Sequence, residues 1–104
     1  MVQWVETIRL EDVLPGAGRT IDVAGKSIAL FNIDGVIYAI DDTCPHMGQS
    51  LGSGEVDGKM VRCRGHGMRF DVTNGFEGGK PGYGVATRAV KEIDGVVFVA
   101  IASS

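Results

Sequence analysis

All the cysteines and histidines of this chain lie in two short segments. The first is Cys44-Pro45-His46 and the second is Cys63-Arg64-Gly65-His66, so each segment offers one thiolate and one imidazole. Thiolate and imidazole together bind zinc or iron. A structural zinc finger usually groups its two cysteines in one loop and its two histidines on one helical turn, whereas here each segment mixes the two types. The mixed arrangement favours a [2Fe–2S] cluster in which both cysteines hold one iron and both histidines hold the other.

The two segments resemble the ligand loops of Rieske iron–sulfur proteins. That family has Cys-x-His, a spacer of moderate length, and then Cys-x-x-His, the order found here. The run 66–71, followed by Asn74-Gly75, is similar to the stretch after the second Rieske loop, and Gly79–Gly84 lies where the family has a proline loop that covers the cluster. The resemblance extends over about residues 41–84. It implies one Rieske-type [2Fe–2S] cluster per chain, with four metal ligands: Cys44, His46, Cys63 and His66.

The resemblance also bears on the reduction potential. High-potential Rieske proteins have two further cysteines in a disulfide, at positions that correspond to Gln49 and Gly65 here. They also have a serine and a tyrosine whose hydroxyls donate toward the cluster sulfurs, where this chain has Met68 and Phe70. Rieske potentials range from about −150 to about +300 mV. Because the hydroxyl donors are missing, the reduced cluster is less stabilised, and the resemblance implies a low-potential centre at or below about zero.

The segments that must position these loops are typical of β-strands. Asp-Gly pairs favour two-residue hairpin turns, because both central residues accept positive φ. Two hairpins are predicted on this basis: 27–33 with 36–40 around Asp34-Gly35, and 86–93 with 96–102 around Asp94-Gly95. Further turns are predicted at 57–58 and 73–75, a strand over 3–10, and one short helical turn over 10–14. The fold class is therefore all-β, with small antiparallel sheets and two cluster-binding loops at one end.

The aromatic and acidic residues lead to two further expectations. Four aromatic side chains are predicted to fill the core: Trp4, Phe31, Tyr38 and Phe98. Four acidic residues near the ligand loops are interpreted as solvated loop charges, with an acidic docking patch as the alternative: Asp41, Asp42, Glu55 and Asp57. The net charge of −3 makes a nucleic acid an unlikely partner and favours a basic docking site on a partner protein.

Length and composition indicate one domain over residues 1–104. The sixteen glycines suggest many tight turns. No basic and apolar leader is visible at the N-terminus, and the longest apolar runs, such as 96–102, are too short to span a bilayer. The expected location is therefore the cytoplasm, without membrane contact.

The motifs indicate an electron carrier rather than an enzyme. The chain has no Gly-rich dinucleotide fingerprint, and both histidines are already used as ligands. It resembles the Rieske-type ferredoxins of bacterial aromatic-ring hydroxylating dioxygenase systems, which serve aromatic hydrocarbon catabolism. The resemblance implies two partners, a flavin-dependent ferredoxin reductase and a terminal oxygenase.

Three alternatives remain open from the sequence. The first is a small accessory subunit of a nitrite reductase-type enzyme, which shares the fold, although many such subunits lack the ligands. The second is a Cys2His2 zinc module without redox function. The third is a simple disulfide between Cys44 and Cys63, which would not require a histidine at a short offset from each cysteine.

Overall fold

The computed structural model describes residues 2–45, 48–64, 67–79 and 81–102, and the strands of this part form three antiparallel sheets. The first sheet has the order β1-β10-β9, from β1 (Val2–Arg9), β10 (Val96–Ala102) and β9 (Val90–Ile93). The second has the order β2-β3-β4-β8, from β2 (Gly18–Val23), β3 (Lys26–Ile33), β4 (Val36–Asp41) and β8 (Thr87–Arg88). The third and smallest consists of β5 (Glu55–Asp57), β6 (Met60–Arg62) and β7 (Arg69–Asp71).

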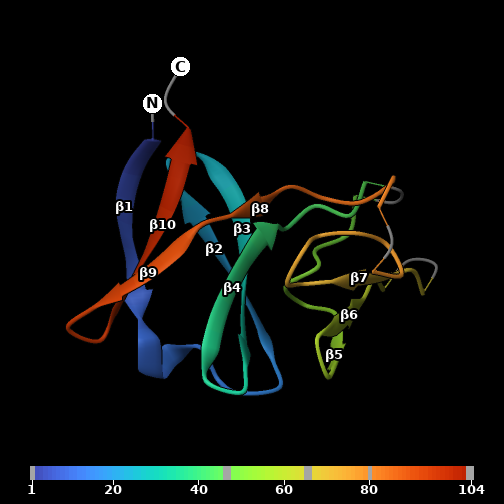
Figure 1. Cartoon of the computed structure of the whole chain (residues 1–104), viewed down its shortest axis with the longest axis horizontal. Helices are drawn as coiled ribbons and strands as arrows, with labels where there is room; N and C mark the ends of the chain where they lie inside the picture. The colour runs from blue at the N-terminus through green and yellow to red at the C-terminus, as the bar shows by residue number, and fades with distance from the viewer. Residues whose placement is uncertain (1, 46–47, 65–66, 80, 103–104) are drawn as a thin grey trace.

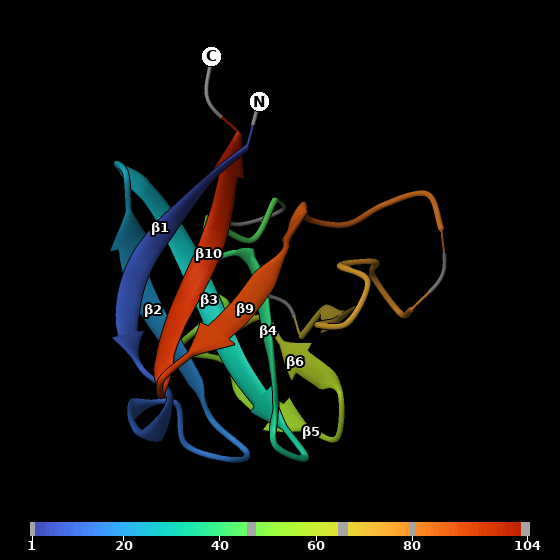
Figure 2. The same cartoon turned by 60° about the vertical axis from the view of Figure 1, so that its left-hand side comes forward.

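The sheets are arranged so that the small one lies apart from the first. Figures 1 and 2 both place β5 and β6 on the side of β4 that faces away from β1. A short 3-10 helix, η1 (Leu10–Asp12), follows β1 and agrees with the predicted helical turn. The described part contains no helix that is long and apolar enough to cross a membrane. The all-β prediction with small antiparallel sheets is confirmed.

The two predicted Asp-Gly hairpins are present. Ile33 pairs with Val36 across the turn between β3 and β4, and Ile93 pairs with Val96 across the turn between β9 and β10. Both residues of each turn have positive φ: Asp34 (53°), Gly35 (87°), Asp94 (51°) and Gly95 (78°). This conformation matches the twist of the flanking strands. The predicted strand over 86–93 is divided in the structure, because β8 pairs with β4 whereas β9 pairs with β10.

The core consists of two hydrophobic clusters. One lies mainly between the first and second sheets and contains Ile28, Leu30, Val97 and Val99. The other lies between the second sheet, the small sheet and the ligand loops. Phe31 is fully buried, as expected, and Tyr38 and Phe98 are half-buried.

The prediction that Trp4 fills the core is wrong. Its side chain is 40% exposed, and the Lys91 Nζ lies 4.4 Å from the centre of its ring. Trp4 stands on the outer face of an outer strand, where a cation–π contact partly covers it.

The loop between β7 and β8 approaches the turn after β7 very closely. The Val85 N–H donates to the Gly75 carbonyl oxygen at 2.8 Å, and Phe76 forms an isolated β-bridge with Gly84. A Cβ at Gly75 would collide with the Val85 carbonyl oxygen, and a Cβ at Gly84 would collide with the Gly75 carbonyl oxygen. The two backbone segments therefore approach as closely as only glycine permits.

Gly75→Ala is expected to lower the midpoint of thermal unfolding by at least about 10 °C, because it adds a backbone collision to an unfavourable positive φ. The matched control is Gly25→Ala. Gly25 has φ +82°, almost the same as the +81° of Gly75, but no atom lies within 4 Å of where its Cβ would stand. The control should lose only about 5 °C. Equal losses in thermal scans of both variants would contradict the close-approach argument.

Candidate metal centre

The first ligand loop joins β4 to β5 and is closed by backbone hydrogen bonds at its cysteine. The Cys44 N–H donates to the Gln49 carbonyl oxygen at 2.8 Å, and the Gly48 N–H donates to the Cys44 carbonyl oxygen at 2.8 Å. Gly48 has φ +70°, with no atom within 4 Å of where a Cβ would stand. The turn therefore requires glycine for its backbone conformation rather than for space.

The second ligand loop joins β6 to β7 and repeats this geometry. The Cys63 N–H donates to the Met68 carbonyl oxygen at 2.7 Å, and the Gly67 N–H donates to the Cys63 carbonyl oxygen at 3.1 Å. Gly67 has φ +73°. Both loops thus bond the cysteine N–H to the carbonyl five residues later, and the cysteine carbonyl to the N–H four residues later. The two cysteines therefore have the same pattern of backbone hydrogen bonds.

Both predicted cysteine ligands are buried in the same apolar surroundings. Cys44 and Cys63 are each 1% exposed, and both belong to the second hydrophobic cluster, with Leu51, Val61 and Phe70. An anionic thiolate in such surroundings is unfavourable unless a positive charge compensates it, and a bound iron supplies that charge. The donor set at these cysteines therefore suits a metal centre. The two predicted histidine ligands, His46 and His66, lie outside the described residues, as do Met47 and Gly65.

The carboxylate of Asp42 forms hydrogen bonds that hold the first ligand loop to the second sheet. Its side chain is buried, and its Oδ1 accepts hydrogen bonds from the Thr20 hydroxyl (2.9 Å), the Ser50 hydroxyl (2.9 Å) and the Gly52 N–H (2.8 Å). Its Oδ2 accepts from the Ser27 hydroxyl at 3.2 Å. The carboxylate therefore ties β2 and β3 to the segment that returns from the loop.

The interpretation of Asp42 as a solvated or docking charge is wrong. Nothing in the sequence signals its burial, because its four donors come from three separate segments: β2, β3 and the chain that returns from the first ligand loop. Its neighbour Asp41 forms an ion pair with Arg88 at 2.9 Å, while Glu55 and Asp57 are exposed, in agreement with solvated charges.

Asp71 plays a comparable part at the end of β7. It is 2% exposed, and its Oδ1 accepts hydrogen bonds from the N–H (2.8 Å) and the hydroxyl of Thr73. Its Oδ2 lies 3.4 Å from the Lys59 Nζ. Burial alone would raise the pKa of Asp71, but the hydrogen bonds from Thr73 and the contact with Lys59 outweigh burial and hold the pKa below its ordinary value. The carboxylate is therefore ionised at neutral pH and fixes the turn that follows the second loop.

The loop with the predicted covering proline runs beside the first ligand loop. The Asp41 N–H donates to the Ala86 carbonyl oxygen at 2.9 Å. A hollow of about 380 Å³ has Thr43 and Pro45 on one side and residues 84–86 on the other. Pro81 itself is exposed, and its role as a cover stays a prediction.

Comparisons with known proteins agree with these features. A family model described as "Rieske [2Fe-2S] domain" matches residues 3–91. The ferredoxin component of the naphthalene 1,2-dioxygenase system of Pseudomonas putida is 38% identical over 74 residues, which is 71% of each chain. A chain in the solved complex of reduced oxygenase and oxidized ferredoxin in carbazole 1,9a-dioxygenase is 30% identical, with a TM-score of 0.84 over 93% of this chain and 92% of that one.

A third similarity concerns the fold alone. A structure described as the small subunit of an NADH-dependent nitrite reductase from Mycobacterium tuberculosis has a TM-score of 0.89, covers 100% of this chain and 99% of that one, and is 21% identical. The family match, the 38% identical relative and the paired cysteine loops agree with one another. This chain belongs to the Rieske [2Fe–2S] domain family, whose cofactor is a [2Fe–2S] cluster.

Proposed function

We propose that this chain is a one-electron carrier that receives electrons from a flavin-dependent ferredoxin reductase and passes them to a terminal ring-hydroxylating oxygenase. In this proposal residues 1–104 act as a single cytoplasmic domain. Cys44 and Cys63 hold one iron of the cluster, and His46 and His66 hold the other. The observation that carries the proposal is the pair of equivalent loops, each with a buried cysteine. The name of the 38% identical relative, a ferredoxin component of a dioxygenase system, supports the choice of partners.

The residues around the centre suit electron transfer without catalysis. The bound cluster supplies a site that gains and loses a single electron. The apolar residues around Cys44 and Cys63 keep water from the thiolates, and Asp42 and Asp71 hold the backbone next to each loop. A centre that only gains and loses one electron does not consume it. The proposal therefore requires one protein that supplies the electron and another that uses it.

The proposal is tested first on protein purified without added metal. We expect a red-brown protein with about two irons per chain that gains a rhombic Rieske-type EPR signal after dithionite reduction. A colourless protein with one zinc would contradict it and support the zinc module.

The partner assignment requires a second experiment. The protein is added to the reductase and oxygenase components of the Pseudomonas putida naphthalene dioxygenase system in place of their own ferredoxin, and naphthalene consumption is measured. Consumption that depends on the added protein is expected. If the protein has a Rieske signal but supports neither this system nor the carbazole dioxygenase system, the oxygenase assignment fails, while the cluster assignment stands. The nitrite reductase alternative rests on a similarity of fold alone.

A low potential is part of the proposal and leads to a specific prediction. Met68 is half-buried and packs against the second hydrophobic cluster, and Phe70 is fully buried there, so neither offers a hydroxyl to the centre. Met68→Ser is expected to raise the potential by up to about 65–130 mV, because a hydrogen bond to a charged acceptor contributes about 1.5–3 kcal/mol and a tenfold change in a one-electron equilibrium is about 59 mV. EPR-monitored redox titration measures the change.

The control for this prediction is Met68→Ala, which removes the thioether without adding a donor. It should shift the potential much less than Met68→Ser does. Identical potentials for the two variants would remove the hydroxyl-donor argument and leave the low potential without its stated cause.

A further inference from the structure

The net negative charge of this chain lies away from the ligand loops. Residues 41–88 contain six acidic and six basic residues, whereas the rest of the chain contains seven acidic and four basic residues and so accounts for the whole net charge of −3. Two of the acidic residues within 41–88, Asp42 and Asp71, are buried. The surface near the ligand loops is therefore more positive than the composition of the chain suggests.

Three arginines dominate this surface around the second ligand loop: Arg62, Arg64 and Arg69. All three are exposed. In the described part of the chain, none of them forms an ion pair or a side-chain hydrogen bond, whereas Arg9, Lys59 and Arg88 each pair with a carboxylate. Glu55 is the cross-strand neighbour of Arg62, but their charged groups do not come within ion-pair distance.

Two of the three arginines are cross-strand neighbours on the small sheet. Arg62 on β6 lies directly opposite Arg69 on β7, and like charges in such a pair are destabilising. The Arg62 guanidinium lies against the second ligand loop, since its Nη2 is 3.0 Å from where a Cβ of Gly67 would stand. Three exposed arginines therefore lie here against two exposed carboxylates, Glu55 and Asp57, which leaves an excess of positive charge near the loop that holds Cys63.

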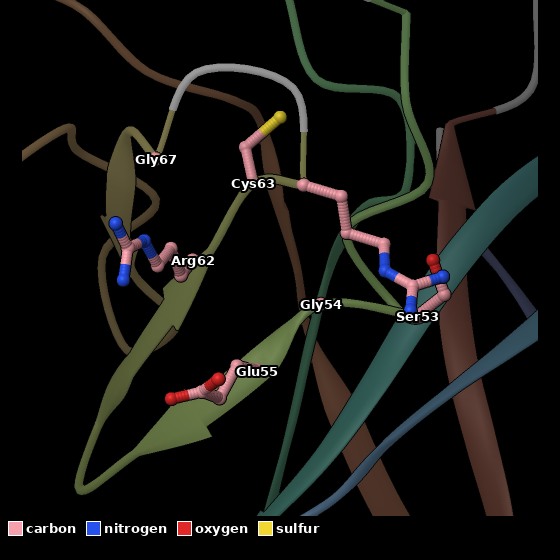
Figure 3. Close-up of a pocket in the computed structure, with 7 residues that line it drawn as sticks. Ser53, Gly54, Glu55, Arg62, Cys63 and Gly67 are labelled. Atoms are coloured by element: carbon pink, nitrogen blue, oxygen red, sulfur yellow. The ribbon is translucent and has the colours of Figure 1, made fainter.

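An open hollow beside Cys63 leaves space next to two of these guanidinium groups, those of Arg62 and Arg64, for a side chain of a partner protein. It has a volume of about 680 Å³, and its lining includes Arg62, Arg64 and the carboxylate of Glu55 (Figure 3). Arg69 lines a smaller neighbouring hollow with Arg62, Glu55 and Asp57. An oxidised cluster with two thiolates, two sulfides and two ferric ions has no net charge when its histidines are neutral, so it would not balance the arginines. A carboxylate from another protein can do so, because guanidinium groups pair well with carboxylates.

We propose that Arg62, Arg64 and Arg69 form a basic docking patch that binds an acidic surface of the redox partner protein. The inference rests on the proposed function and adds the sign of the partner's charge. The proposed partner surface is acidic, whereas the net charge of the chain alone favours a basic partner surface. Docking at this patch brings the partner to the loop that contains Cys63, one of the proposed cluster ligands.

The first test uses the unmodified holoprotein, so it does not depend on any variant folding. The dithionite-reduced protein is mixed by stopped flow with the acidic haem protein cytochrome b5 or the basic haem protein cytochrome c. We expect the rate with cytochrome b5 to fall about tenfold between about 10 mM and about 300 mM NaCl, because salt screens attraction between exposed charges. A rate with cytochrome b5 that rises with salt would overturn the proposal.

The second test compares variants with small oxidants of opposite charge, ferricyanide and tris(phenanthroline)cobalt(III). The readout is the ratio of the two rate constants at low salt. A change in reduction potential alters both rates in the same direction, so their ratio mainly reports local charge. The double variant Arg64→Gln/Arg69→Gln should lower the preference for ferricyanide by at least about threefold. The control Arg19→Gln changes the net charge on β2 and should leave the ratio within about 1.5-fold.

The outcomes separate this inference from the proposed function. A protein without a Rieske EPR signal would contradict the proposed function before any kinetics are measured. A protein with the signal whose oxidant ratio is the same in the double variant and in the Arg19→Gln control would contradict the docking patch alone. A selective fall in the double variant, together with the salt-dependent reaction with cytochrome b5, would support the patch.

Discussion

Cys44→Ser and Cys63→Ser are each expected to give a protein without visible colour, with less than about a tenth of the iron of the unmodified protein and no Rieske EPR signal. The proposed role of both thiolates as ligands of the same iron means that losing either one should remove the cluster, so the two variants should fail equally. The backbone N–H and C=O groups of each cysteine already bond within the loop, and serine keeps these bonds. Iron analysis and EPR spectra of the three proteins measure the effect.

The control for these variants is Gln49→Ser, which changes an exposed side chain in the first ligand loop and leaves its backbone carbonyl in place. It should retain the iron content and EPR signal of the unmodified protein. A Cys63→Ser protein that keeps two irons per chain would refute the proposed ligand set, whatever the outcome at Cys44.

The hairpins could be predicted from the sequence because their signals are local. Asp34-Gly35 and Asp94-Gly95 lie between apolar runs, and both pairs adopt the positive φ that such turns require. Strand β2 was not predicted, although its turn to β3 has the same conformation, with Ala24 at φ 53° and Gly25 at φ 82°. Alanine rarely adopts positive φ, so nothing in the Ala24-Gly25 pair indicated the turn.

The positions that sequence reasoning missed depend on contacts between distant segments. Trp4 has an apolar side chain, but its face of the first sheet is left uncovered by the other sheets, and no local pattern indicates which face that is. Residues 86–93 form a continuous strand pattern, yet the chain passes there from the second sheet to the first. The predicted ligand set requires Cys44 and Cys63 to lie near each other, and both belong to the second hydrophobic cluster, while their role as ligands stays a prediction.

Asp42→Ala is expected to destabilise the first ligand loop. The change leaves the buried Gly52 N–H without its acceptor, which costs about 1–3 kcal/mol. The hydroxyls of Thr20 and Ser50 also lose an acceptor, but they are not fully buried and can bond to each other or to water. We therefore expect a total loss of about 1–3 kcal/mol. Because release of the cluster makes unfolding irreversible, the measurement is the rate at which visible absorbance disappears at a fixed guanidinium concentration. It should rise at least about tenfold.

Two control variants decide whether the acceptor or only the shape of Asp42 matters. Asp42→Asn keeps the size of the side chain and one carbonyl oxygen, which can still accept from the Gly52 N–H, so its bleaching rate should lie between those of the unmodified protein and Asp42→Ala. Asp57→Ala removes an exposed carboxylate on β5 and should change the rate by less than about threefold. Bleaching of Asp42→Ala at the rate of Asp57→Ala would show that this hydrogen-bond network does not hold the loop. In that case the loop's stability would have to come from the cluster and the backbone bonds at Cys44 alone.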